Sequence, residues 1–298
     1  MSAHHGGEVG PLLLVPPVLF WIYLAAALRE RDRGGWSNWR TASFGAGAAL
    51  LAAAALVPDQ DLVGHMWRHL LVGMLAPLGL VLGAPVTLAL RALPRRRGRR
   101  LVRVLRHPAL GPVSHPATGL VLTVGGLYLL HLTPLYRASL DRPWLHTLVL
   151  LHFLVSGYAF TWAVAGPDPG PRRARVPVRL VVLGLAVAGH ATLAQLMYAG
   201  LVEAAVPVDE LRTAATVMYY GGDLAEILLA LALLATWRPA PRRVGRDGSA
   251  GCAVRPDGEP AGVVAYRLAQ RGRVADRERP AQPGEQLRHP VEPFGAAP

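Results

Sequence analysis

Apolar residues gather into seven long blocks that are almost free of charge. A helix rises 1.5 Å per residue, so about 20 residues cross the roughly 30 Å hydrocarbon layer of a bilayer. The pattern therefore predicts an all-α protein, a polytopic membrane bundle of seven transmembrane helices. The third block is longer than one crossing needs, so we expect it to tilt or to contain a turn. The predicted spans are about residues 11–28, 41–57, 62–90, 117–134, 144–165, 177–200 and 212–237.

Arginine is distributed unevenly between the connections of these blocks. Residues 29–40, 91–106 and 166–179 hold four, eight and four arginines, whereas the alternate connections at 58–61, 135–143 and 201–211 hold none, two and none. Short basic loops stay on the cytoplasmic side of a membrane. The count predicts an N-terminus outside the cell and a C-terminus in the cytoplasm.

The two ends of the chain differ in character from the blocks. Residues 1–10 contain no arginine, so the first block lacks the positive region of a cleavable signal, and we expect a retained helix. Residues 238–298 are rich in Arg, Pro and Gly, with too little apolar surface to offset the entropy cost of ordering. They predict a disordered cytoplasmic tail.

Composition agrees with a membrane protein and excludes several other classes. Of the 298 residues, 52% are hydrophobic and only 17% are charged, which does not fit a soluble enzyme domain. The net charge of +12 lies in short connections and the tail rather than on one folded polar face, so we predict lipid and no nucleic acid as a partner. The single cysteine, Cys252, excludes a disulfide within one chain.

Histidines inside the predicted spans are the main candidates for chemistry, because a polar side chain in lipid is costly unless it serves a site. With the topology above, all of them fall in the outer half of the membrane or at its midplane. A histidine bonded to a backbone carbonyl for packing is the structural alternative for each one. The set comprises His65, His69, His131, His146, His152 and His190.

Methionines and carboxylates accompany these histidines. Met66 follows His65 directly, and Met197 lies two turns from His190 on the same helical face. Imidazole with thioether favours copper, especially Cu(I), over hard cations. Histidines at similar depth on facing helices could instead ligate haem, and Asp223 with Glu226 could form part of a proton path. We expect Asp223 to pair with His190 and fix its tautomer.

Two stretches of the chain resemble one family of bacterial membrane proteins. The first is HMWRHLLVGMLAPLGLVLGAPVTLALRALP at 65–94, and the second is LYLLHLTPLYRASLDRPWLHTLVLLHFLVSGYAFTWAVAGPDP at 127–169. With GH at 189–190 and YYGGD ending at 223, they resemble the CtaG-type cytochrome c oxidase assembly factors over roughly residues 11–237. Some members carry an acidic residue and a histidine where this chain has Val149 and Leu150.

The resemblance implies a non-enzymatic assembly factor of the bacterial plasma membrane that helps copper reach the oxidase catalytic subunit. The alternatives are a haem-binding membrane oxidoreductase and a copper or proton carrier. Against these stand the lack of a recognisable cofactor-binding domain and of a ligand ladder in the inner half of the spans. We predict one copper site with His146 and Asp223 in supporting contact, and with the ligands His65, His69, His131, His152, His190, Met66 and Met197.

Overall fold

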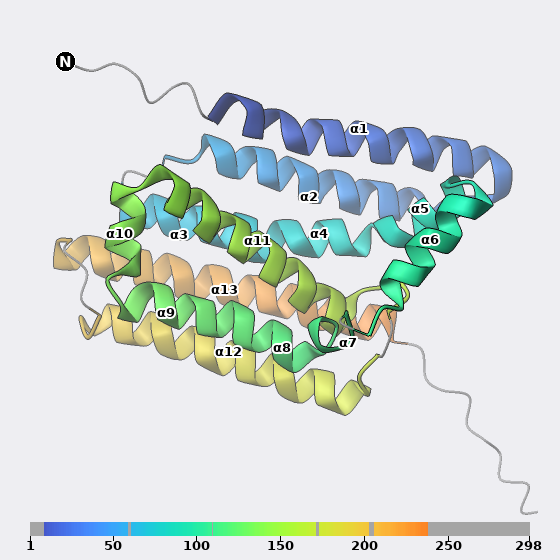
Figure 1. Ribbon diagram of the computed structural model, residues 1–298. Helices are drawn as coiled ribbons and strands as arrows, with labels where there is room; N and C mark the ends of the chain where they lie inside the picture. Colours follow the sequence, from blue (N-terminus) through green and yellow to red (C-terminus); the bar gives the residue numbers. More distant parts are fainter. Residues whose placement is uncertain (1–8, 59–60, 109, 171–172, 203–205, 238–298) are drawn as a thin grey trace, which may run out of the picture. The chain divides into compact units, whose positions relative to one another are not determined.

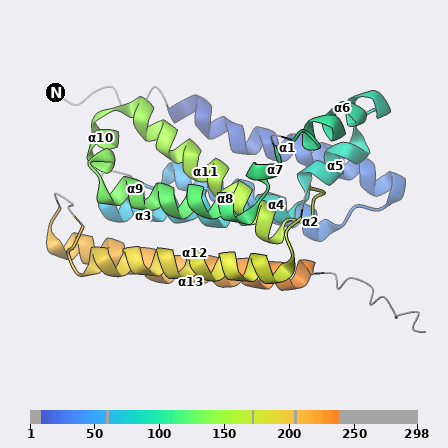
Figure 2. The same ribbon diagram turned by 60° about the horizontal axis from the view of Figure 1, so that its bottom comes forward.

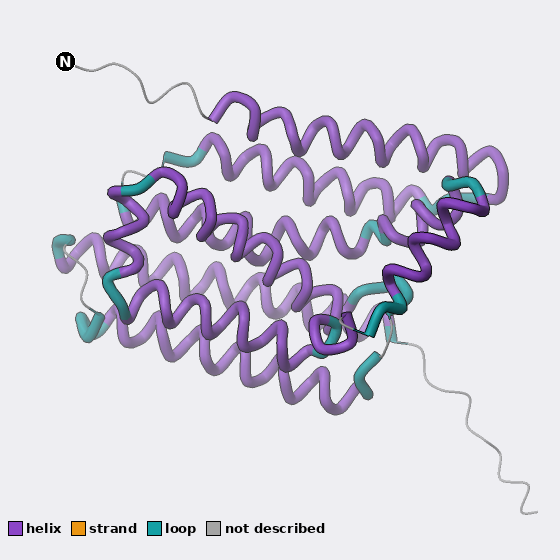
Figure 3. Tube along the Cα trace, in the orientation of Figure 1, coloured by secondary structure: helices purple, strands orange, loops and turns teal. Residues whose placement is uncertain are grey.

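The computed structural model describes residues 9–58, 61–108, 110–170, 173–202 and 206–237. Every regular element in these ranges is helical, and short loops join the helices at the two ends of the bundle (Figure 3). The ends are named here after the helices found at them, the α10 end and the α6 end (Figure 1). The predicted disordered tail, 238–298, lies outside the described residues.

The first two predicted spans form one helical hairpin. Helix α1 (Val9–Gly34) packs against α2 (Asn38–Leu56), and the rings of Tyr23 and Phe44 stack with centroids 3.9 Å apart. The Tyr23 hydroxyl donates to the Gly83 carbonyl at 2.7 Å. The hairpin is therefore tied to the third block.

The long third block is interrupted twice, as its length led us to expect. It runs as α3 (Leu62–Leu70), a π-helical turn η1 (Leu71–Leu75), α4 (Ala76–Leu82) and α5 (Pro85–Ala92). Between α4 and α5 the backbone of Ala84 is left-handed, with φ 51°. The next connection is not a simple loop, because six of its eight arginines lie on helix α6 (Arg95–Leu105).

The fourth predicted span also contains a π-helical turn. After the short α7 (Leu110–Val113), the chain forms α8 (Pro116–Leu120), η2 (Val121–Gly125) and α9 (Gly126–Leu132). The connection after it contains α10 (Leu135–Asp141), which is bent by 79° from the preceding helix. Sequence periodicity treated this stretch as a connection, because seven residues are too few to show a helical pattern.

Three long helices complete the bundle: α11 (Pro143–Ala165), α12 (Val176–Tyr198) and α13 (Val208–Thr236). Helices α12 and α13 run side by side, and α13 also packs along α3 (Figure 2). The elements α3, η1, η2, α9 and α11 pack around the same interior. The predicted histidines lie on α3, α9, α11 and α12.

Four described helices are long and apolar enough to cross a membrane, at Leu62–Ala92, Pro143–Ala165, Val176–Tyr198 and Val208–Thr236. A fifth is added if α8 to α9 and the bent α10 count as one span. Helices cover the first two predicted spans as well, although α1 contains three prolines and α2 is rich in alanine and glycine. The described part of this membrane protein is all-helical, whereas the count of seven spans stays a prediction.

The outer faces of these helices are apolar. On α13, for example, Leu224, Ile227 and Leu231 are each more than half exposed. Soluble proteins rarely expose continuous apolar surface of this kind. Lipid is the solvent that suits these faces.

Close backbone contacts set the distances between helices near the histidines. A Cβ added to Gly157 on α11 would lie 1.9 Å from the Gly73 carbonyl oxygen of η1. Only glycine permits this approach, because any side chain would separate the two helices. The π-helical turn η1 is thus held directly against α11.

Hydrogen bonds join the motif GPDP at 166–169 to the residues that follow the motif LGAP at 82–85, at the α6 end. The buried Asp168 carboxylate accepts from the Val86 amide at 3.0 Å, the Thr87 amide at 2.7 Å and the Thr87 hydroxyl at 2.5 Å. These donors form the first turn of α5, where backbone amides otherwise lack partners. Asp168 therefore fixes the left-handed turn at Ala84 from a point some eighty residues later in the chain.

Candidate metal centre

The first pair of histidines lies at the α10 end of the bundle. His65 on α3 and His131 on α9 have ring centroids 6.1 Å apart, and the Tyr136 ring lies 4.8 Å from that of His65. Both imidazoles are buried, with 3% and 5% of their surface exposed. We call His65 and His131 the outer pair.

A backbone contact fixes the tautomer of His131. Its Nδ1 lies 2.9 Å from the Leu127 carbonyl oxygen, which can only accept, so Nδ1 donates and Nε2 keeps a free lone pair. Among the described residues, neither His131 Nε2 nor His65 Nε2 has a hydrogen-bond partner, although both atoms are buried. An N–H bonded to a carbonyl behind a free ring nitrogen is the usual arrangement of a metal-binding histidine.

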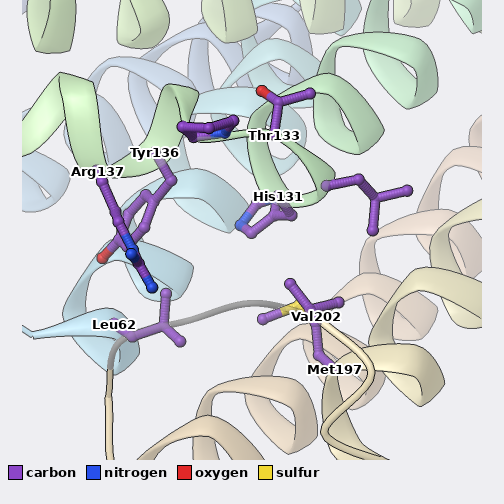
Figure 4. A pocket seen from close by; sticks show the side chains of 9 residues that line it. Leu62, His131, Thr133, Tyr136, Arg137, Met197 and Val202 are labelled. Atoms are coloured by element: carbon purple, nitrogen blue, oxygen red, sulfur yellow. The ribbon is translucent and has the colours of Figure 1, made fainter.

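A cavity of about 70 Å³ opens beside the outer pair. Figure 4 shows His131, Tyr136 and Arg137 on one side of it and Met197 on the other, with the sulfur of Met197 directed into the hollow. Leu62 and Val202 also line it. Around this one space, α9 thus supplies an imidazole, α10 a phenol and a guanidinium, and α12 a thioether.

The second pair lies deeper, between α3 and α12. The rings of His69 and His190 have centroids 6.3 Å apart, and the Phe153 ring packs edge-on against His69 at 4.6 Å. Both histidines line a cavity of about 60 Å³, together with Met74, Thr161 and Glu226. We call His69 and His190 the inner pair, and this space the inner cavity.

The inner cavity contains three buried polar atoms without a hydrogen-bond partner in the described part of the chain. They are His69 Nδ1, His190 Nε2 and one carboxylate oxygen of Glu226. A buried polar atom without a partner costs about 1–3 kcal/mol. Three such atoms at one cavity point to a bound species that would satisfy them.

The spacing of each pair suits an ion between two imidazoles. A ring nitrogen lies about 1.1 Å from the ring centroid and a metal–imidazole bond is about 2.0–2.1 Å long, so linear ligation separates the centroids by roughly 6.2–6.4 Å. The observed 6.1 and 6.3 Å fall close to that range. Within the described ranges, no three His, Cys, Asp or Glu side chains are grouped to hold one metal ion. Each place therefore offers two imidazoles, with a methionine lining the neighbouring cavity.

The structure does not bring all the expected ligands to one point. His152 Nε2 lies 3.0 Å from the Leu122 carbonyl oxygen of η2, so this histidine bonds a carbonyl of the π-helical turn. The Leu122 carbonyl also accepts from the Gly126 amide at the end of η2. Met66 is fully buried in the apolar core, and His146 is half-buried near the start of α11. The expected single site is thus divided into two pairs, with His152 outside both.

Glu226 rather than Asp223 lines the inner cavity with His190. Asp223 is half-buried one turn earlier, and Gly222 faces the His190 ring, where a Cβ would lie 1.9 Å from the ring carbon Cε1. The expected pairing of His190 with Asp223 is not among the hydrogen bonds of the described residues. Both carboxylates lie on the same face of α13, so sequence spacing alone could not choose between them.

Sequence reasoning overlooked Met74 and gave Tyr136 no role at the site. Met74 follows His69 by five residues, which would put the two about 140° apart on a regular α-helix. The π-helical turn η1 lies between them and brings both side chains to the inner cavity. A π-helical turn has no clear sequence pattern, so only the spatial structure reveals this neighbour.

Comparison with known proteins shows the family to which the sequence belongs. Residues 21–240 match the family described as cytochrome c oxidase caa3 assembly factor. The chain belongs to this family. The match begins within α1, extends past the end of α13 and includes both histidine pairs. It confirms the resemblance drawn from the sequence motifs.

Three mycobacterial proteins resemble part of this chain. Uncharacterized proteins of Mycobacterium bovis and Mycobacterium tuberculosis are each 42% identical to it over 134 residues, and one of Mycobacterium leprae is 40% identical over the same length. Each alignment covers 43% of this chain and 20% of the relative, so the chain spans about a fifth of these relatives' length. No solved structure matches the chain.

Proposed function

We propose that this cytochrome c oxidase assembly factor carries Cu(I) and delivers it to the catalytic subunit of the oxidase. Copper is the cargo of the protein and not a permanent cofactor. The observation that carries the proposal is the set of buried imidazole nitrogens without partners, on His65, His69, His131 and His190. A structural histidine would have its nitrogens satisfied by backbone or side-chain groups, as His152 is by Leu122.

The donor set favours a soft monovalent ion. Neutral imidazole and thioether bind Cu(I) well, whereas Mg²⁺ and Ca²⁺ require several oxygen ligands. Met197 lines the cavity beside His131, and Met74 lines the inner cavity. The distance between the two ring centroids of each pair, 6.1 and 6.3 Å, also suits an ion that accepts few ligands.

The size of the cavities favours an ion over haem. Cavities of about 70 and 60 Å³ can hold an ion or a few water molecules, whereas sites for drug-sized molecules occupy about 300–1,000 Å³. A porphyrin between the members of either pair would require these helices to separate. The haem alternative is therefore less well supported than copper.

A carrier through the membrane has less support too. Between the inner cavity and the α6 end, α11, α12 and α13 contribute an apolar core that includes Val164, Leu183 and Leu233. A charged ion crossing this layer would lose its ligands in a medium of low polarity, which is costly. We propose delivery from the α10 half of the bundle and not passage across it.

The orientation of the bundle follows from the charge on α6. All six arginines of this helix are exposed, and together they form a basic surface at the α6 end. Under the positive-inside rule this end faces the cytoplasm and binds anionic lipid headgroups, so the outer pair opens away from the cytoplasm. We propose the plasma membrane of a bacterium as the location.

The test is the copper content of oxidase assembled in the presence of variants. A bacterial strain that lacks its own assembly factor is complemented with the full chain, and copper and haem are measured in the purified oxidase. We expect His131→Asn to lower the copper-to-haem ratio, because the asparagine amide can still donate to Leu127 but offers no counterpart of Nε2. The matched control His107→Asn, at an exposed histidine near α6, should give normal oxidase. An unchanged ratio with His131→Asn, at equal protein level, would remove the basis of the proposal.

A further inference from the structure

The outer pair and the inner cavity are separate spaces. No residue lines both the cavity beside His131 and the inner cavity. His65 and His69 are one helical turn apart on α3, which separates the two pairs by about 6 Å along the helix axis. Leu127, whose carbonyl bonds to His131 Nδ1, is also one of the residues that line the inner cavity. The two spaces are therefore neighbours joined through the same helices.

Methionine side chains lie in the core beside these two cavities. Met66, Met197 and Met218 are each at most 1% exposed and belong to one core cluster. With Met74 in the inner cavity, four of the five methionines in the chain lie in this part of the bundle. Methionine fills irregular gaps in cores, but its thioether is also a ligand for Cu(I). Only Met197 and Met74 of these four line a cavity, Met197 the one beside His131 and Met74 the inner cavity, so a thioether lies close to each imidazole pair.

The inner cavity is shaped for its two histidines. Gly222 leaves room for the His190 ring, and Gly73 leaves room for the His69 ring, whose Cε1 would lie 3.4 Å from an added Cβ. Both π-helical turns border the space, through Gly73 and Met74 of η1 and Thr123 of η2. Such turns are maintained in helices mainly at functional sites.

Charge distinguishes the inner cavity from the cavity at the outer pair. Glu226 is the acidic residue among the described residues that line the inner cavity, and its carboxyl group is buried. The lining of the outer cavity has no acidic residue and contains Arg137. A carboxylate therefore lines the inner cavity, whereas at the outer cavity the carboxylate of Glu210 accepts from the Leu62 amide and is not part of the lining.

We infer that the inner cavity is a second copper position, held by His69 and His190 with Met74 and Glu226 beside them, and that Cu(I) passes to it from the outer pair. The inference rests on the proposed function and adds to it a capacity of two ions and an order of occupation. The outer position receives the ion, and the inner position holds it in the bundle beside a carboxylate.

The test is a titration of the full-length protein with Cu(I). The protein is purified in detergent without oxygen, and Cu(I) is added in competition with a chromophoric chelator. We expect two ions per wild-type chain, one in His190→Asn and one in His131→Asn. Glu226→Gln should weaken the inner ion about tenfold or more, the usual effect of removing a group that supports a metal ligand. Asp223→Asn is its matched control and should leave both ions in place.

Each other outcome has a defined meaning. If the wild type binds one ion that His131→Asn abolishes and His190→Asn retains, the inner position does not exist, although the proposed function stands. If the wild type binds one ion and each of the two variants abolishes it, the four histidines form one joint site and the inference fails. If the wild type binds no copper, the proposed function itself fails. Should His190→Asn not fold, as judged by gel filtration, Met74→Leu replaces it, with Met218→Leu as control, and loss of affinity at one of the two ions is expected only for Met74→Leu.

Discussion

The glycine that faces His190 allows the inner position to be disturbed without removing any ligand. In Gly222→Ala the new methyl carbon would begin 1.9 Å from Cε1 and 2.2 Å from Nδ1 of the His190 ring. Carbon atoms in contact are about 3.5–4.0 Å apart, so the ring or the helix must move by roughly 1.6–2 Å. Metal–ligand distances tolerate only about 0.2 Å of change. We expect this variant to lose the inner ion while it keeps both histidines.

The assay for this variant is the same Cu(I) titration, with Gly184→Ala as the control. Gly184 lies on α12, the helix that carries His190. An added Cβ at Gly184 meets nothing within 4 Å. Gly184→Ala should bind two ions, and its helix should be stabilised by about 0.5–1 kcal/mol. Two ions of unchanged affinity in Gly222→Ala would refute the placement of the inner ion against this ring.

Three further predictions concern the frame around the site. Asp168→Ala removes the acceptor of three hydrogen bonds at the start of α5 and should lower the free energy of unfolding by about 3 kcal/mol. The control Asp141→Ala, at an exposed residue, should leave the melting temperature in detergent unchanged. Equal melting temperatures of the two variants would show that the LGAP turn is stable without Asp168. Reporter fusions after residues 98 and 172 should give a cytoplasmic signal and fusions after 60 and 206 an external one, and an external signal at 98 would reverse the orientation. Removal of residues 245–298 should leave insertion and oxidase assembly intact, which loss of oxidase at normal protein level would contradict.

Apolar periodicity was a good guide to the helices and a poor one to their interruptions. It predicted helices over 144–165 and 177–200, and the structure has them at Pro143–Ala165 and Val176–Tyr198. It did not predict α10 or the π-helical turns η1 and η2. Hydrophobicity reports where a helix is buried in lipid, whereas these features depend on backbone contacts with neighbouring helices such as that between Gly73 and Gly157.

The sequence identified polar residues that the structure buries, but it could not predict how these residues are grouped. The depth of His65, His69, His131 and His190 followed from position along each span, and the structure places all four in the interior. Which of them face each other depends on the rotation of each helix, and that is set by packing. The same reason explains His152, which lies at a suitable depth but is turned toward Leu122.

Copper bound to the full-length protein is the most direct measure of the central claim. The protein would be purified without oxygen from copper-supplied cells, alongside the double variant His131→Asn/His190→Asn, and copper per chain would be measured by elemental analysis. We predict copper in the wild type and none in the double variant, with both proteins folded and inserted. Equal copper in the two proteins, or none in the wild type, would contradict the claim that these imidazole pairs carry the metal.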